Sequence, residues 1–130
     1  TRSLASAHRI AEILDENIVL TSPENGVKKV KDGSIDFENV SFKYREDASE
    51  YALENVNLHI QAGQTIGVIG TTGSAKTTLV QLIPRLYDAT TGVVRVGGVN
   101  VRDYDLSVLR DSVNITLQKN VLFQELCVKI

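Results

Sequence analysis

The feature that most constrains the fold is a glycine-rich loop between two apolar segments. The apolar run 65–69 precedes the loop and predicts a strand, and the run 79–83 follows it and predicts a helix. Strand, loop and helix in that order form the context in which a P-loop holds phosphate groups. The spacing of a first glycine, four residues, a small residue, Lys and Thr therefore predicts a phosphate-binding loop. Its candidate binding residues are Gly70, Thr71, Thr72, Gly73, Ser74, Ala75, Lys76, Thr77 and Thr78.

The residue types in this loop suit phosphate chemistry. Glycines allow the backbone turns that point successive N–H groups at phosphate oxygens, and a helix N-terminus attracts the same anion. Lys76 is expected to reach the β- and γ-phosphates, and the Thr77 hydroxyl to ligate Mg²⁺. The alternative is a turn that only joins a strand to a helix. That interpretation does not require a Lys-Thr pair at the start of the helix.

One position departs from the motif. The pattern requires glycine at position 75, and this chain has Ala75. If residue 75 adopts the left-handed conformation, its Cβ costs about 1–2 kcal/mol. A strain of ~1.4 kcal/mol would weaken phosphate binding about tenfold.

Composition limits the remaining classes. At 130 residues the chain is one domain or less, and 42% hydrophobic residues is ordinary for a globular protein. The net charge of −2 comes from interspersed charges of both signs, so no basic face indicates nucleic acid. The apolar runs are too short to predict a membrane span. The single Cys127 rules out an intramolecular disulfide and is typical of a reducing compartment.

The chain divides into three parts. Residues 1–16 predict a helix, because apolar residues recur at three- and four-residue steps from Leu4 to Leu14. Residues 17–34 are polar and turn-rich and predict a linker. Residues 35–130 form the third part, which begins with a strand over 35–44 that has a local irregularity near Asn39.

Alternation and turn residues predict the other elements of the third part. Antiparallel strands are expected at 56–60, 93–96 and 99–101, the last two joined by a tight turn at Gly97-Gly98. The helix after the loop is expected at about 76–86. A second helix through 106–110 has Asp105 or Ser107 as its cap, and a strand is expected at 113–118.

These landmarks together resemble the first part of the nucleotide-binding domain of an ABC transporter of the exporter type. The resemblance runs from about residue 1 to 123 and depends on the order and spacing of several segments. They are Val40-Ser41-Phe42-Lys43-Tyr44, the imperfect P-loop at 70–78, Arg85-Leu86-Tyr87-Asp88, residues 97–104 from Gly97 to Tyr104, and residues 117–123 from Leu117 to Phe123.

The resemblance implies a fold and a ligand set. The fold is α/β, a P-loop NTPase-like ABC ATPase core with an antiparallel β subdomain. Tyr44 matches the aromatic residue that stacks on adenine, and Gln118 matches a glutamine that contacts Mg²⁺ and water. The implied cofactors are therefore ATP and Mg²⁺, with Thr77 and Gln118 as the metal contacts. From spacing alone, Tyr44 could equally cover a strand edge, and Gln118 could be a polar strand end.

The resemblance also implies partners and gaps. The helix over 1–16 would connect to a transmembrane domain, and a second nucleotide-binding domain would complete a dimer at the cytoplasmic face of a membrane. The family's Walker B strand, signature motif and helical subdomain do not appear before Ile130. We therefore expect an incomplete domain that binds ATP without hydrolysing it alone, and that is either soluble or prone to aggregate through an exposed sheet edge. The alternative is a non-catalytic scaffold or interaction fragment whose altered P-loop no longer holds nucleotide.

Overall fold

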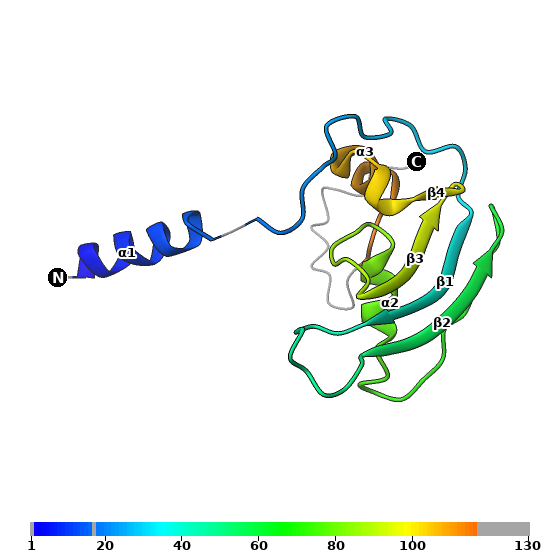
Figure 1. The fold of residues 1–130 in the computed structure, drawn as a ribbon, viewed down its shortest axis with the longest axis horizontal. Coiled ribbons are helices and arrows are strands. Elements are labelled where there is room, and N and C mark those ends of the chain that lie inside the picture. The colour runs from blue at the N-terminus through cyan, green and yellow to red at the C-terminus, as the bar shows by residue number, and fades with distance from the viewer. Residues whose placement is uncertain (1, 17, 117–130) are drawn as a thin grey trace, which may run out of the picture.

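The computed structural model describes residues 2–16 and 18–116, so the predicted contacts of Gln118 lie outside the described residues. Figure 1 shows helix α1 standing apart from a body built of a curved sheet with helices on one side. The elements in chain order are α1 (Arg2–Leu14), β1 (Ile35–Phe42), β2 (Leu53–Ile60), α2 (Lys76–Leu82), β3 (Thr91–Val96), β4 (Val99–Asn100), the 3-10 turn η1 (Val101–Asp103) and α3 (Leu106–Ser112).

Helix α1 forms where the apolar spacing predicts it. All of its described side chains are exposed, including the apolar Leu4 and Leu14 at 73% and 78%. The apolar face of α1 is therefore not covered by any described part of the chain.

The sheet is antiparallel, with strand order β2-β1-β3-β4. The irregularity expected near Asn39 is present. Asn39 has φ 47°, and the pairing of β1 with β2 shifts register between Phe37 and Val40. Gly92 on β3 lies against this bulge and has a φ of +82°. A Cβ at Gly92 would collide with the Asn39 and Glu38 carbonyl groups. A glycine is thus required where β3 passes the bulge.

The turns around the sheet match their sequence signals. Gly97 and Gly98 have φ values of 59° and 79° and join β3 to β4 as the predicted hairpin. Asp105, rather than Ser107, caps α3, because its side chain accepts hydrogen bonds from the N–H groups of Ser107 and Val108. The β2 strand begins at Leu53, three residues before the predicted start.

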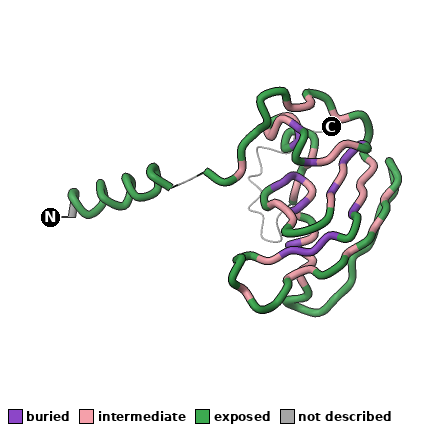
Figure 2. Tube along the Cα trace, viewed as in Figure 1, coloured by how far each residue is buried: buried purple, intermediate pink, exposed green. Residues whose placement is uncertain are grey.

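The core lies between the sheet and the helices, and Figure 2 shows the buried residues on these facing surfaces. The buried apolar side chains are Phe37, Val40, Phe42, Leu82, Val94, Val96, Val101, Tyr104 and Leu109. Leu82 of α2 is 1% exposed, and burial of such a side chain stabilises the fold by about 1.5–3 kcal/mol. This burial holds α2, and the loop before it, against the sheet.

Two predicted strands are not formed. Residues 65–69 are neither helix nor strand, and Ile69 is 97% exposed. A strand is stable only when a neighbour pairs with its N–H and C=O groups, and no described strand pairs with this segment. Residues 113–116 are also irregular, and the rest of that predicted strand lies outside the described residues. The glycine-rich loop nevertheless follows residues 65–69 directly, as predicted.

The helix after the loop is shorter than predicted. It ends at Leu82 instead of about residue 86, because Pro84 has no N–H to donate to the helix. Arg85 adopts a left-handed φ of 54°. The N–H groups of Arg85 and Leu86 then bond to the carbonyl oxygens of Leu82 and Gln81, which is the Schellman pattern for ending a helix.

The segment predicted as a linker makes specific contacts with the body. The Val27 N–H donates to the Asp103 carbonyl at 2.8 Å, and the Asp105 N–H donates to the Val27 carbonyl at 3.1 Å. The Leu106 N–H donates to the Ser22 hydroxyl at 2.9 Å. The later part of 17–34 is therefore held beside the start of α3. The division into connector helix, linker and partial domain stays a prediction.

Candidate functional site

A hollow of about 360 Å³ lies where the glycine-rich loop meets the end of β1. Its lining combines loop backbone, one lysine, hydroxyl groups and two aromatic rings. The lining residues are Tyr44, Tyr51, Ala52, Gly73, Ser74, Ala75, Lys76, Thr77 and Thr78.

The structure brings most of the predicted site residues together here. Residues 73–78 and Tyr44 line the hollow directly. Gly70, Thr71 and Thr72 are exposed and do not line it, but Gly70 and Thr71 contact Lys76 through their carbonyl groups. Gln118 lies outside the described residues.

Lys76 is the centre of the loop. Its Nζ donates to the Gly70 carbonyl at 2.8 Å, the Thr71 carbonyl at 2.7 Å and the Ser74 hydroxyl at 2.9 Å. The loop thus folds around a cation. Hydrogen bonds from a charged group contribute about 1.5–3 kcal/mol. These contacts hold the ammonium group close to the loop backbone that lines the hollow.

Glycine at position 70 leaves room for the Ser74 and Lys76 side chains. A Cβ at Gly70 would collide with the Ser74 hydroxyl oxygen and approach Lys76 Nζ. A side chain there would therefore displace the hydroxyl group and the ammonium group that face each other across the loop. The first glycine of the motif thus keeps this cradle free, which fits an anion held by the lysine and the loop N–H groups.

Ala75 meets the condition on which the strain argument depends. Its φ and ψ are 57° and 21°, the left-handed conformation, and it immediately precedes α2 without a side-chain cap. A Cβ in this conformation costs about 1–2 kcal/mol. The departure from the motif therefore falls at a position where glycine is the favoured residue.

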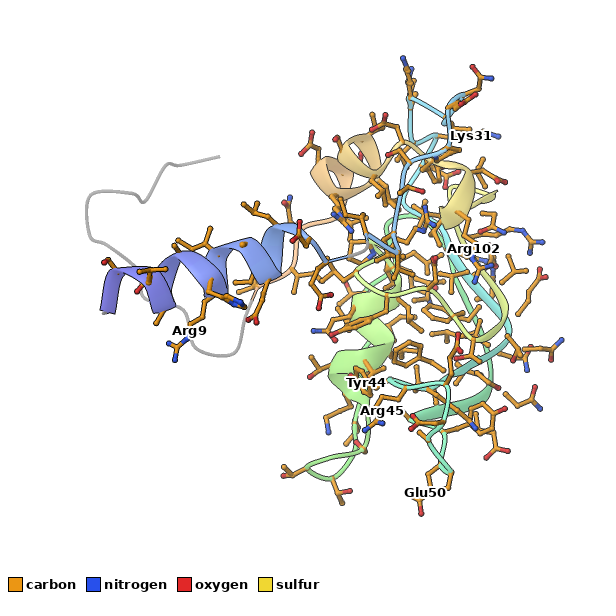
Figure 3. The ribbon with its side chains drawn as sticks, turned by 60° about the vertical axis from the view of Figure 1, so that its left-hand side comes forward. Arg9, Lys31, Tyr44, Arg45, Glu50 and Arg102 are labelled. Atoms are coloured by element: carbon orange, nitrogen blue, oxygen red, sulfur yellow. The ribbon has the colours of Figure 1, made fainter. Side chains whose placement is uncertain are left out.

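Tyr44 contacts the helix side of the hollow. Its hydroxyl lies 2.6 Å from the Thr78 hydroxyl, and its ring packs edge-on with Phe42 at 4.9 Å and Tyr87 at 5.4 Å between ring centroids. Figure 3 shows Tyr44 beside the first turns of α2. With 55% of its surface exposed, Tyr44 keeps accessible aromatic surface beside the loop.

The hydroxyl groups after the lysine differ in availability. Thr77 is exposed and lines the hollow, whereas Thr78 is 4% exposed and engaged with Tyr44. Thr77 is thus the hydroxyl that can reach a bound ion. Within the described residues, no group of three or more His, Cys, Asp or Glu side chains is arranged to hold a metal.

Sequence reasoning missed Tyr51 and Ala52, which complete the lining of the hollow. The pairing of Phe42 with Leu53 brings the residues after β1 and the residues before β2 together, and this pairing is the signal that would have identified Tyr51 and Ala52. Only the register of that pairing reveals it, and the register depends on the bulge at Asn39.

Comparison with known proteins identifies the family of this loop and sheet. The sequence model for ABC transporters matches residues 53–129. The chain belongs to the ABC transporter family. Among the described residues of this ABC family chain, no helix is long and apolar enough to cross a membrane.

The relatives of this ABC family chain include exporters. YgaD of Bacillus subtilis (strain 168), provisionally named a multidrug export ATP-binding/permease protein, is 41% identical over 126 residues, which are 96% of this chain and 22% of that protein. The ATP-dependent lipid A-core flippase of Coxiella burnetii (strain RSA 493 / Nine Mile phase I) is 31% identical over 124 residues, 95% of this chain and 21% of that protein.

A solved structure of a bacterial Atm1-family ABC exporter with ATP bound matches the fold with a TM-score of 0.78 and 26% identity. The match covers 94% of this chain and 21% of the exporter. This ABC family chain thus spans about a fifth of the length of its relatives. The resemblance to exporter nucleotide-binding domains and the predicted α/β fold with an antiparallel sheet are confirmed.

Proposed function

We propose that the hollow beside the glycine-rich loop binds Mg-ATP, as the ATP-binding portion of an exporter nucleotide-binding domain. The observation that carries the proposal is Lys76, whose Nζ is held at the loop backbone in a hollow that Tyr44 also lines. A cation, converging N–H groups and an aromatic ring suit the triphosphate and the base of one nucleotide. The family match supports ATP as that nucleotide.

Each predicted residue has a role in this proposal. Lys76 would contact the β- and γ-phosphates, and the N–H groups of residues 73–78 their oxygens. Thr77 would ligate Mg²⁺, which supplies charge neutralisation between the phosphates. Tyr44 would contact the base. Gln118 is proposed as a second contact to Mg²⁺ on the family resemblance alone.

The wider function is proposed on the same basis. ATP bound here would couple, in the parent exporter, to transport through a transmembrane domain on the cytoplasmic side, with a second nucleotide-binding domain as the partner in a dimer. No carboxylate lines the hollow among the described residues. We therefore propose that the groups described here bind ATP and leave activation of the attacking water to others.

A specific observation favours a second function. Lys76 Nζ already has three hydrogen-bond partners within the loop, and Ala75 carries a strained conformation. An anion that binds Lys76 Nζ must replace at least some of these three hydrogen bonds. If that exchange is unfavourable, the chain is a scaffold or interaction fragment that does not hold nucleotide.

Calorimetric titration with Mg-ATP up to millimolar concentration separates the two functions. We expect saturable binding that Lys76→Ala reduces at least tenfold, since a charge-assisted contact of about 1.5–3 kcal/mol is lost. Mg-tripolyphosphate, which has no base, should bind the same loop and show the same loss in the variant. Absence of binding by either probe, or binding that Lys76→Ala leaves intact, would support the scaffold function instead.

A further inference from the structure

Two tyrosines, not one, border the hollow, and the strand register explains why. Phe42 on β1 pairs with Leu53 on β2. Tyr44 lies two residues after Phe42, and Tyr51 lies two residues before Leu53. This pairing brings the segment after β1 and the segment before β2 to the same end of the sheet. Tyr44 and Tyr51 both line the hollow there.

The loop between the two tyrosines is held closed by several contacts. The Ala52 N–H donates to the Phe42 carbonyl at 2.8 Å, which holds the residue next to Tyr51 against the end of β1. Lys43 Nζ donates to the Ala48 carbonyl at 2.7 Å and lies 4.4 Å from the centre of the Tyr51 ring. A cation this close to an aromatic face is attracted by it. These contacts hold Tyr51 beside the hollow.

The two rings differ in their surroundings. Tyr44 is tied to Thr78 and packed with two other aromatic rings. Tyr51 is 43% exposed, and the one aromatic or cationic contact described for its ring is that with Lys43. Tyr51 therefore has ring surface to offer a ligand in the hollow without giving up packing in the core.

We propose that Tyr51 is a second base-contacting residue, so that a purine base meets two tyrosine rings at this site. The inference depends on the proposed nucleotide binding and adds a specificity-determining residue to it. Aromatic rings stack on bases through their faces, and removal of one such ring by alanine substitution weakens binding by about tenfold or more. The phosphates lie with Lys76, so they should not be affected by Tyr51.

The test compares two probes on one set of variants. Mg-ATP carries the base and Mg-tripolyphosphate does not. We expect Tyr51→Ala to weaken Mg-ATP binding about tenfold and to leave the affinity for Mg-tripolyphosphate within twofold of the unchanged chain. Tyr51→Phe, the matched control, keeps the ring and should retain the Mg-ATP affinity. Tyr51→Leu keeps apolar bulk without a ring and should behave like Tyr51→Ala.

Several outcomes would overturn the inference. Tyr51→Ala could leave the Mg-ATP affinity unchanged, or lower the affinity for both probes equally, which is the pattern of a general structural effect.

An NMR titration adds an independent reading, because the ring protons of Tyr51 should shift with Mg-ATP and not with Mg-tripolyphosphate. Lys76→Ala distinguishes the two proposals: it should weaken the binding of both probes at least tenfold if the loop holds phosphate. If the chain binds neither probe, both proposals are wrong. If Lys76→Ala weakens Mg-ATP binding but the Tyr51 variants do not, only the proposal for Tyr51 is wrong.

Discussion

At the scale of single residues, Ala75 is a strained position next to the proposed phosphate site. Its φ of 57° lies in the left-handed region, where a Cβ is strained. Replacement by glycine removes a cost of about 1–2 kcal/mol and adds about 0.5–1 kcal/mol of chain entropy to the unfolded state. We expect Ala75→Gly to raise the free energy of unfolding by about 0.5–1 kcal/mol, measured by urea denaturation.

The same variant tests whether the strain weakens binding. A loop that keeps residue 75 left-handed both with and without nucleotide carries the same strain in both states, so the Mg-ATP affinity of Ala75→Gly should rise by less than the tenfold that the sequence alone predicts. A full tenfold gain would mean that the loop rearranges when it binds. A loss of stability would show that the methyl group of Ala75 makes packing contacts that outweigh its strain.

Tyr104 is the buried residue whose ionisation links stability to pH. Its side chain is fully buried, its hydroxyl donates to the Val96 carbonyl at 2.7 Å, and burial, helped by the nearby charge of Asp32, raises the pKa of Tyr104 above its ordinary value. The folded state thus favours the neutral phenol. The stabilisation of the fold by the neutral Tyr104 phenol is fully present below about pH 10, where tyrosine ionises in the unfolded chain. This stabilisation is lost as the pH rises through the higher pKa of Tyr104 in the folded state.

Tyr104→Phe should therefore show two effects in denaturation experiments. At pH 8 it should destabilise the fold by about 1–2 kcal/mol, since the buried Val96 carbonyl loses its donor. Between pH 9 and 11 its stability should fall less steeply than that of the unchanged chain. Equal slopes would mean that Tyr104 does not carry the pH dependence.

At the scale of elements, helix α3 depends on a single capping residue. Asp105 accepts hydrogen bonds from Ser107 N–H at 3.0 Å and from Val108 N–H at 3.4 Å. Loss of such a cap costs about 1 kcal/mol, and Asp105→Ala should lower the free energy of unfolding by about that amount. Asp103→Ala is the matched control, because it removes the same charge from an exposed side chain two residues earlier. Similar losses in both variants would indicate a charge effect in place of a cap.

At the scale of the whole molecule, the described sheet has an exposed edge. Strand β2 has eight residues and pairs on one side only, whereas the opposite edge, β4, has two. Beside β2 lies an apolar groove of about 260 Å³ that Ile66 and Val68 help to line. Long unpaired edges favour pairing with another chain. We expect light scattering to give a mass above the 14.2 kDa of the monomer as concentration rises.

Charge placed in that groove should oppose the association. Val68 is 49% exposed, so Val68→Lys should keep the fold and reduce the mass toward that of the monomer. A monomeric chain at high concentration, with cooperative thermal unfolding, would contradict the prediction of association.

The local sequence determined the elements whose signals lie within a few residues. Gly97-Gly98 predicts the turn between β3 and β4, Asp105 is one of the two predicted caps of α3, and the irregularity of β1 is predicted near Asn39. These features could be predicted because positive φ angles and short side-chain hydrogen bonds depend on neighbours in the chain. The loop residues 70–78 and their order before a helix could likewise be predicted. The roles of these site residues in binding ATP stay predictions.

Tertiary structure decided what depends on distant partners. Residues 65–69 have the composition of a strand, but a strand requires a paired neighbour, and the described sheet provides none. Tyr51 joins the hollow because the pairing of β1 with β2 brings the segment before β2 beside the segment after β1. The sequence spacing places Lys76 in the loop, whereas the folded backbone selects the carbonyl groups that its ammonium contacts. Propensity acts along the chain, and pairing and packing act across it.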